Sequence, residues 1–236
     1  MFARPEICRT RTFLLSARNM RAGNFHGGIF SNLGYNKRCL SITEKPFCFM
    51  MMYDKKDYSH ILGTEGFSDD LLTNHFNLYA GYVKNVNMLD EKLRSAEVGT
   101  PEYAELRRRF GWEWNGMRLH ELYFGNITKE TNGMSGELEK KISEKFGSRE
   151  AWEADFRATG AMRGIGWVIL AHDTESDALH NVWINEHDVG HLAGAKPLLV
   201  MDVFEHAFVF DYGMNRADYI DAFMNAVDWR AVEERM

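Results

Sequence analysis

The sequence predicts an α+β protein, with an N-terminal antiparallel helical hairpin and a C-terminal domain of a three-stranded antiparallel sheet and helices. Two long segments with apolar residues at spacings of three and four, separated by a short turn, indicate the hairpin. Short β-branched and aromatic runs broken by polar turns follow, and they indicate the sheet. We therefore divide the chain into a basic leader (1–52), a helical domain (53–130) and an α+β domain (131–236).

The first long helix is expected to begin after Ser68, a capping residue followed by Asp69 and Asp70 in the first turn. A histidine lies on its apolar stripe, so we expect His75 on the buried face. The stripe consists of Leu71, His75, Leu78, Tyr82, Val86, Leu89 and Leu93.

The second long helix is expected to begin at Thr100 and Pro101, a cap followed by a proline in the first helical position, and to run to about Gly125. Its stripe also contains a histidine, which predicts that each helix of the hairpin presents one imidazole to the other. The stripe consists of Tyr103, Leu106, Phe110, Met117, His120 and Phe124.

The C-terminal half is expected to alternate helices and strands. Helices are predicted at about 135–146 and 149–162, and a final pair at about 205–212 and 216–228. The predicted strands are 166–171, 179–185 and 197–201.

Composition narrows the classes of partner. The first 52 residues carry eight Lys/Arg and two acids, a net charge of +6. Since the whole chain carries −6, the remaining 184 residues carry −12. An acidic body argues against nucleic acid as a partner, because a phosphate backbone needs a clustered basic face. The longest apolar run, Phe47 to Tyr53, is far too short to span a membrane, so we expect a soluble protein.

The leader has two interpretations. It is either an organelle-targeting presequence, which would make the protein mitochondrial, or an untranslated stretch placed upstream of a true start at Met51 or Met52. We favour the second and expect a cytoplasmic protein, because no clear amphipathic helix is present. All three cysteines (Cys8, Cys39 and Cys48) lie in the leader, so no thiolate metal site is expected in the body.

An Asp-x3-His pair, Asp202 and His206, follows the third predicted strand. Alone it is a weak signal, since a buried Asp and His often pair with each other. His75 and His120 change the balance, because a buried histidine must be satisfied by hydrogen bonds or by a metal. Three imidazoles and one carboxylate suit iron, manganese or zinc and do not suit calcium or magnesium.

Four segments carry a resemblance to one family. PLLVMDVFEHAF at 197–208 resembles the signature of iron/manganese superoxide dismutases, and GIGWVIL at 164–170 resembles their glycine-tryptophan strand. HFNLYAGYVKNVN at 75–87 and RLHELYF at 118–124 resemble their two ligand helices. The resemblance implies one iron or manganese ion per subunit, with superoxide as substrate. The implied ligands are His75, His120, Asp202 and His206.

The same resemblance assigns residues around the ion. His187 would replace the glutamine that usually contacts the bound solvent, with Gly116 leaving room for it, and this favours iron slightly over manganese. Tyr82 would be the gateway tyrosine, with Tyr79 as its rival, because the family usually places this tyrosine eight residues after its histidine and the interval here is seven. Two aromatic positions that line the family's site are matched by Tyr123 and Trp167.

Further features of the family concern its dimer. Glu205 resembles the acid that reaches the partner's ligand histidine, which implies a homodimer. Tyr79 and Val209 stand where a histidine and a tyrosine usually bond across the interface, so that contact is expected to be missing. Arg216 is expected to supply positive charge at the rim of the site.

Two other functions stay open on the residues alone. A zinc-dependent hydrolase would fit a His3Asp site but would need another acid/base carboxylate, and a non-catalytic metal-binding relative would fit the departures at Tyr79 and Val209. A zinc pair made by His187 and His191 is disfavoured, because the His-x3-His spacing requires a helix and this stretch reads as a loop.

Overall fold

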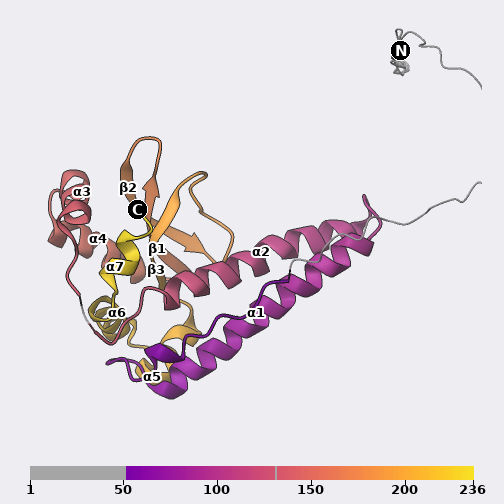
Figure 1. Ribbon diagram of the computed structural model, residues 1–236, viewed down its shortest axis with the longest axis horizontal. Helices are drawn as coiled ribbons and strands as arrows, with labels where there is room; N and C mark the ends of the chain where they lie inside the picture. The colour runs from indigo at the N-terminus through magenta and orange to yellow at the C-terminus, as the bar shows by residue number, and fades with distance from the viewer. Residues whose placement is uncertain (1–51, 131) are drawn as a thin grey trace, which may run out of the picture. The chain divides into compact units, whose positions relative to one another are not determined.

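The α+β class is confirmed by the computed structural model, which describes residues 52–130 and 132–236 (Figure 1). Predictions about residues 1–51, including the presequence and the alternative start sites, lie outside the described residues. The part described from Met52 onward belongs to a single compact unit, within which the predicted boundary at residue 130 falls between α2 and α3. No helix in the described ranges combines the length and apolar character needed to cross a bilayer.

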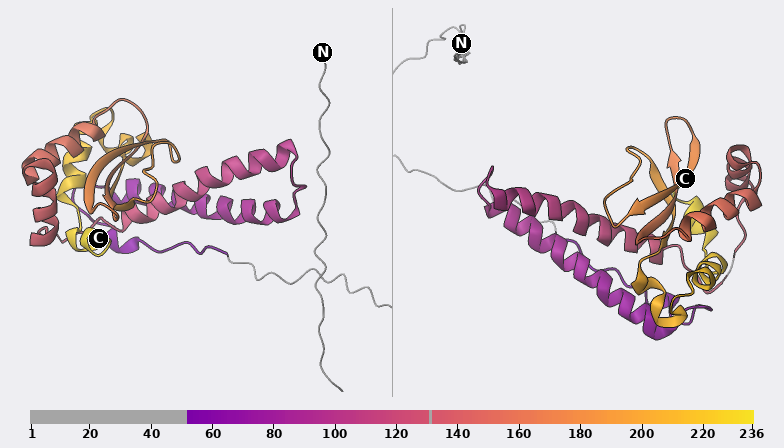
Figure 2. Two further views of the ribbon diagram at one scale, coloured as in Figure 1. Left: turned by 90° about the horizontal axis from the view of Figure 1, so that it is seen from above. Right: turned by 180° about the vertical axis from the view of Figure 1, so that it is seen from behind.

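The helical hairpin consists of α1 (Asp69–Ser95) and α2 (Pro101–Phe124), which lie side by side in all views (Figures 1 and 2). Both predicted caps are present: the side chains of Ser68 and Thr100 accept hydrogen bonds from the backbone N–H groups of Leu71 and Tyr103. Each bond satisfies an amide that the first helical turn cannot pair internally.

The predicted stripe of α1 is wrong at one position. Leu78 is 37% exposed, whereas the adjacent Tyr79 is completely buried. The extended segment before η1 (Ser59–Ile61) explains the difference, because Lys56 donates its backbone N–H to the Tyr79 hydroxyl and the Tyr58 ring packs against the Tyr79 ring. The stripe thus turns toward a segment whose position local periodicity could not reveal.

The sheet consists of β1 (Gly166–Asp173), β2 (Ala178–Asn185) and β3 (Lys196–Asp202), all antiparallel in the order β2-β1-β3. Gly166 opens β1 with φ +148°, and a Cβ there would lie 1.9 Å from the Ile184 carbonyl oxygen. Only glycine fits so close an approach of two strands. Helix α2 packs on β3, while α3 (Gly136–Phe146) and α4 (Arg149–Gly160) pack on β2, with α4 also against β1.

The first predicted C-terminal helix is divided, and the second is shorter than expected. Residues 205–212 form the short 3-10 helix η2 (Glu205–Ala207) and then α5 (Val209–Tyr212). The second predicted helix, 216–228, is α6 (Arg216–Asn225), and a helix that was not predicted, α7 (Trp229–Glu233), follows it. The second helix ends early because residues 226–228 pair with the segment after α2: Thr128 donates to the Ala226 carbonyl, and Asp228 donates to the Asn126 carbonyl. The Asp228 side chain then caps α7.

Candidate metal centre

Four side chains converge between the hairpin and the sheet. One ligand atom from each of His75, His120, Asp202 and His206 lies within 4.8 Å of every other. The Asp202 Oδ2 atom is 3.2 Å from His75 Nε2, 3.1 Å from His206 Nε2 and 3.7 Å from His120 Nε2. The side chains of His75, His120 and Asp202 are buried, whereas that of His206 is 29% exposed. The cluster is therefore closed except on the side of His206.

Each ligand is positioned by its own element. His75 lies on α1 and His120 near the end of α2, on the faces that the two helices turn toward each other. Asp202 is the last residue of β3, and its Oδ1 atom accepts the backbone N–H of Phe204 at 2.8 Å. This tight turn brings His206, in η2, back to the same carboxylate.

The protonation of His120 is fixed by its surroundings. Its Nδ1 lies 2.6 Å from the Gly116 carbonyl oxygen, which can only accept, so Nδ1 carries the hydrogen. Burial first, and then the nearby His75, hold the pKa of His120 well below its usual value, so the ring is neutral. Nε2 therefore presents a lone pair, and it has no hydrogen-bond partner among the described residues.

His120 Nε2 carries no hydrogen, so it cannot donate a hydrogen bond to Asp202, although it faces that carboxylate at a distance of 3.7 Å. An orphaned buried nitrogen is costly unless something accepts its electrons. A metal cation shared with the carboxylate would satisfy both groups, and the residues present fit such an ion. Simple histidine-aspartate pairing does not account for this atom.

Asp202 supplies the single negative charge of the cluster. Burial alone would raise its pKa, but the His206 and His75 rings, by charge and by hydrogen bonds, hold that pKa well below its usual range. Three imidazoles with one carboxylate form a ligand set of intermediate hardness, which suits iron, manganese or zinc.

His187 lies beside the cluster with both ring nitrogens engaged. The Trp167 indole N–H donates to Nδ1 at 3.0 Å, and Nε2 lies 2.7 Å from the Tyr82 hydroxyl. Since an indole N–H can only donate, the hydrogen of neutral His187 is on Nε2. Both nitrogens of His187 thus contact protein side chains, and His191 Nε2 lies 3.0 Å from the His187 carbonyl oxygen, so the geometry gives no support to a zinc pair of these two residues.

A closed loop points His187 inward. Asn185 and Val189 exchange backbone hydrogen bonds of 2.8 and 3.3 Å, and Glu186 adopts a left-handed conformation with φ +50°. The loop between them turns the imidazole into the protein, where it is completely buried. Burial lowers the pKa of His187 from 6.5 to about 4.

The expectation for Gly116 needs a correction. A Cβ at this position would lie 2.6 Å from the Tyr82 ring atoms Cδ1 and Cε1, so the missing side chain makes room for Tyr82 rather than directly for His187. The Tyr82 ring then packs 5.0 Å from the His120 ring, with its hydroxyl on His187. Burial, followed by the charge of Asp202, raises the pKa of Tyr82 well above its usual value.

Tyr79, the rival of Tyr82, points its hydroxyl elsewhere. It donates to Glu121 Oε1 at 3.0 Å and accepts the Lys56 N–H at 3.2 Å. Its ring stacks 6.5 Å from His120, but its hydroxyl does not join the His187 contact. Of the two tyrosines, only Tyr82 is hydrogen-bonded to His187.

The other residues expected around the site are found at different depths. Tyr123 and Trp167 are completely buried and pack against ligand rings, 5.2 Å from His75 and 5.0 Å from His120 respectively. Glu205 and Val209 are exposed beside the cluster. Arg216 donates to the carbonyl oxygens of residues 162 and 164 and lies over the Phe208 ring, which ties two surface segments together.

Three neighbours of the site were not predicted from the sequence. Trp112 lies 4.4 Å from the His187 ring, Phe204 stacks 5.2 Å from His206, and Tyr219 donates its hydroxyl to the Asp202 carbonyl oxygen at 2.6 Å. Trp112 is eight residues before His120 on the same helix, so helical periodicity could have identified it. Tyr219 left no such signal, because it reaches the site from α6.

Comparisons with known proteins agree with this geometry. Residues 134–235 match the family described as iron/manganese superoxide dismutases, C-terminal domain. Superoxide dismutase [Fe] of Aquifex pyrophilus is 37% identical over 192 residues, which cover 77% of this chain and 90% of that protein. The chain belongs to the iron/manganese superoxide dismutase family. Other relatives are superoxide dismutase [Mn] 2 of Haloferax volcanii (37% identical, 69% of this chain and 83% of that protein) and superoxide dismutase [Fe] of Cupriavidus metallidurans (35% identical, 78% and 96%).

The names of these superoxide dismutases include both metals, so the family assignment supports iron or manganese without choosing between them. They do not favour the zinc-dependent hydrolase. Because the matched regions cover most of each relative, the likeness extends over both the hairpin and the sheet.

Proposed function

We propose that this chain disproportionates superoxide at one iron or manganese ion held by His75, His120, Asp202 and His206. Two superoxide anions and two protons give one molecule of oxygen and one of hydrogen peroxide. The observation that carries the proposal is the buried lone pair of His120 Nε2, which faces the Asp202 carboxylate and has no hydrogen-bond partner in the described part of the chain. When bound, the ion would supply one-electron chemistry between its divalent and trivalent states.

The ligand set suits an anionic substrate. A single carboxylate beside three neutral imidazoles leaves a divalent or trivalent cation with a net positive charge, which attracts superoxide at short range. Deep burial of Asp202 and His120 keeps the low-dielectric surroundings in which this attraction is strong. Arg216 would add positive charge at longer range, opposing the acidic body.

Tyr82 and His187 would handle the protons. The Nε2–H of His187 donates to the Tyr82 oxygen, so the Tyr82 hydroxyl hydrogen is free to point to solvent or substrate. Burial keeps the pKa of Tyr82 high, so the proton stays on that oxygen until the peroxide anion, a strong base, takes it. His187 orients the hydroxyl, and Trp167 in turn fixes the tautomer of His187.

We lean to iron because of this hydrogen bonding. A glutamine amide has two N–H hydrogens, whereas neutral His187 has one, which the Tyr82 contact uses. Less hydrogen bonding from the protein is then left to tune an ion-bound solvent. Trivalent manganese is a stronger oxidant than trivalent iron and requires more of that tuning.

We also propose a homodimer through the surface around Glu205. Exposed apolar side chains accompany Glu205 there, and such patches are typical of protein interfaces. They are Met162, Ile165, Val209, Phe210 and Met214. The Arg216 bonds to residues 162 and 164 tie the segments that carry them to each other.

Reconstitution with each metal tests the enzyme proposal. The metal-free protein would be loaded in turn with iron, manganese or zinc, and superoxide turnover and metal content would be measured. We expect one ion per chain and turnover with iron, manganese or both, but none with zinc. Tight iron or manganese without turnover would instead identify a non-catalytic binding protein.

A matched pair of variants tests the ligands. His120→Ala removes the orphaned nitrogen and should lower metal content by at least about tenfold, because a ligand is lost. His60→Ala removes an exposed histidine of η1 and should leave metal content unchanged. Equal metal content in both variants would contradict the proposed site.

A further inference from the structure

A cavity separate from the proposed metal centre lies beside α2. It encloses about 630 Å³ between α2, the N-terminal segment, the loop before β3 and the C-terminus. Its walls are both apolar and charged, and the residues that line it include Lys56, Tyr58, Trp114, Arg118, Leu122 and Arg235. None of them is a proposed metal ligand.

The charge of this cavity is opposite to that of the body. Three cations (Lys56, Arg118 and Arg235) line it with one carboxylate, Glu121, giving an excess of two positive charges. The chain after residue 52 carries −12 overall, so the cavity is a local exception. An anion would be attracted to it.

The one carboxylate already accepts hydrogen bonds from three side chains. Glu121 Oε2 accepts Lys56 Nζ at 2.9 Å and an Arg118 guanidinium N–H at 2.7 Å, while Oε1 accepts the Tyr79 hydroxyl. Glu121 is buried, so it fixes the two cations at the cavity wall. Lys56 and Arg118 retain further N–H donors, since an ammonium has three and a guanidinium five.

Arg235 is held on the opposite side. Its guanidinium donates to the carbonyl oxygens of Leu122 and Leu198 and to the Asn126 side chain, so the group is anchored by neutral acceptors rather than by a carboxylate. Burial lowers its pKa, but an arginine remains charged at neutral pH. Its positive charge is thus not neutralised by a direct partner within the described part of the chain.

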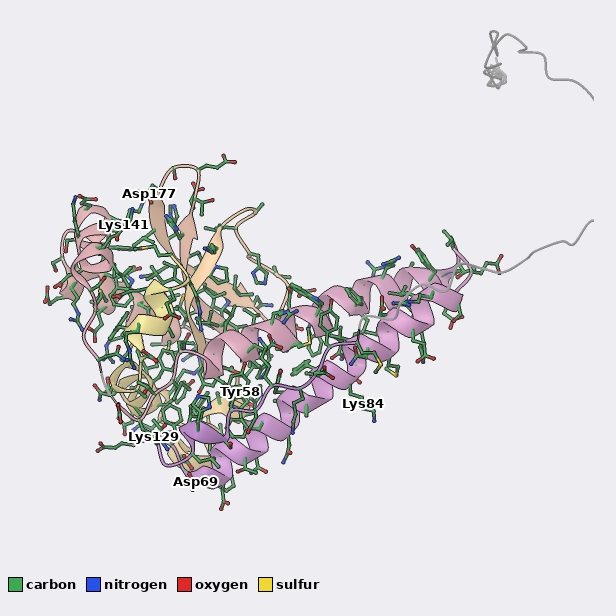
Figure 3. The ribbon with its side chains drawn as sticks, viewed as in Figure 1. Tyr58, Asp69, Lys84, Lys129, Lys141 and Asp177 are labelled. Atoms are coloured by element: carbon green, nitrogen blue, oxygen red, sulfur yellow. The ribbon has the colours of Figure 1, made fainter. Side chains whose placement is uncertain are left out.

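The remaining walls offer flat apolar contacts. Trp114 is partly buried under the Arg118 guanidinium. The Tyr58 ring, labelled in Figure 3, packs 5.9 Å from the Tyr79 ring of α1 and 5.1 Å from the Phe124 ring of α2. Leu119, Leu122 and Pro197 add aliphatic surface. A site with an apolar lining and a few convergent charges is typical of small-molecule binding.

We propose that this cavity binds a small amphipathic organic anion, one with a carboxylate, sulfonate or phosphate group on an apolar body. The anionic group meets Arg118 and Lys56, and the apolar body lies against Trp114 and Leu122. The basic segment 1–52 has the wrong sign of charge to be the occupant. The site shares α2 with the proposed ligand His120, and Tyr79 contacts both Glu121 and the His120 ring.

Fluorescence titration with 8-anilinonaphthalene-1-sulfonate, an aromatic sulfonate, tests the inference on the metal-loaded full chain. We expect one saturable site per chain, displaced by decanoate but not by inorganic phosphate. The uncharged analogue N-phenyl-1-naphthylamine should bind at least about tenfold more weakly, because it lacks the anionic group. Equal affinity for the two probes, or no saturable site, would overturn the proposal.

Variants locate the site. Arg118→Met should weaken binding of the sulfonate by about tenfold, and Arg118→Lys should restore most of it, because the charge returns. Asn115→Trp keeps all three cations but fills the cavity, so it should abolish binding of the sulfonate. A ligand that binds the folded protein raises its Tm, and this rise should also be absent from the variant.

The control is Lys84→Met, which removes an exposed lysine that projects from α1 on the side away from α2 (Figure 3) and does not line the cavity. It should bind the sulfonate like the wild type. Unchanged binding in both Arg118→Met and Asn115→Trp would show that the probe binds elsewhere, and would refute the assignment.

Discussion

At the scale of single residues, the position of the hydrogen on His187 follows from its two hydrogen-bond partners. The Trp167 N–H fixes that hydrogen on Nε2, and the Tyr82 hydroxyl, 2.7 Å away, receives it. A glutamine at 187 could donate to Tyr82 and to a solvent molecule at the same time. The two side chains therefore hold different numbers of donors at the same location.

His187→Gln should keep the metal and change the chemistry. We expect metal content within about twofold of wild type, since residue 187 is not a ligand, and a changed ratio of iron-loaded to manganese-loaded superoxide turnover because hydrogen bonding around the ion changes. Metal analysis and turnover with each metal would check this. Loss of the metal would contradict the placement of His187 outside the ligand set.

The same residue predicts a dependence of stability on pH. The folded protein holds the pKa of His187 at about 4, below its ordinary 6.5, so between these values the unfolded chain binds a proton that the folded chain does not. The free energy of unfolding should therefore fall as pH drops from 6.5 to 4, by about 3 kcal/mol from this group alone, and level off below. Urea unfolding of wild type and His187→Gln at equal metal loading would isolate the effect, which should be absent from the variant. Parallel pH profiles would refute it.

The sequence located the four residues of the cluster because each carries a local signal. His75 and His120 lie on apolar stripes, and Asp202 and His206 belong to a specific motif. The hydrogen-bond partners could not be read in this way. Gly116 and Tyr82 touch only because α1 and α2 cross closely at that point, and the choice between Tyr82 and Tyr79 depended on where the segment around Lys56 lies.

At the scale of elements, the close approach of α1 and α2 depends on glycine 116. Its α-hydrogen faces the Tyr82 ring, where a Cβ would lie 2.6 Å from two ring carbons. Glycine inside a helix normally costs about 1 kcal/mol relative to alanine, so its presence here has a packing reason.

Gly116→Ala should destabilise the hairpin. The added methyl group must displace the Tyr82 ring from His187, and overpacking costs about 1 to 3 kcal/mol, which outweighs the gain of about 1 kcal/mol in helix propensity. Gly111→Ala on the same helix is the matched control, because nothing lies within 4 Å of a Cβ there. Chemical denaturation should show a lower free energy of unfolding for the first variant and a higher one for the second. Stabilisation by both would contradict the packing argument.

Element boundaries were predictable where a local cap marks them. Ser68 and Thr100 begin α1 and α2 as expected. The end of α6 at Asn225, before the predicted end at 228, arises instead from backbone bonds to residues 126 and 128, about a hundred positions earlier in the chain. Asp228, which caps α7, was the local signal that could have revealed the new helix.

At the scale of the whole molecule, two of the places where apolar residues are exposed can be compared as candidate interfaces. One lies around Glu205, where Phe210 is 63% and Met214 is 91% exposed. The other is the turn between α1 and α2, where Val98 is 77% exposed. Only the first adjoins the proposed metal centre, because Glu205 is next to His206.

The proposed homodimer predicts a mass of twice 27.3 kDa for the full chain in solution. Phe210→Glu should dissociate the dimer. A twofold interface uses the same surface on both subunits, so the variant would bury two negative charges in an apolar contact. We expect the dissociation constant to rise at least about a hundredfold, equivalent to about 3 kcal/mol. Sedimentation velocity over a range of protein concentrations would measure it. Val98→Glu places the same charge at the distant turn and should stay dimeric, so a monomeric wild type, or equal behaviour of the two variants, would exclude an interface around Glu205.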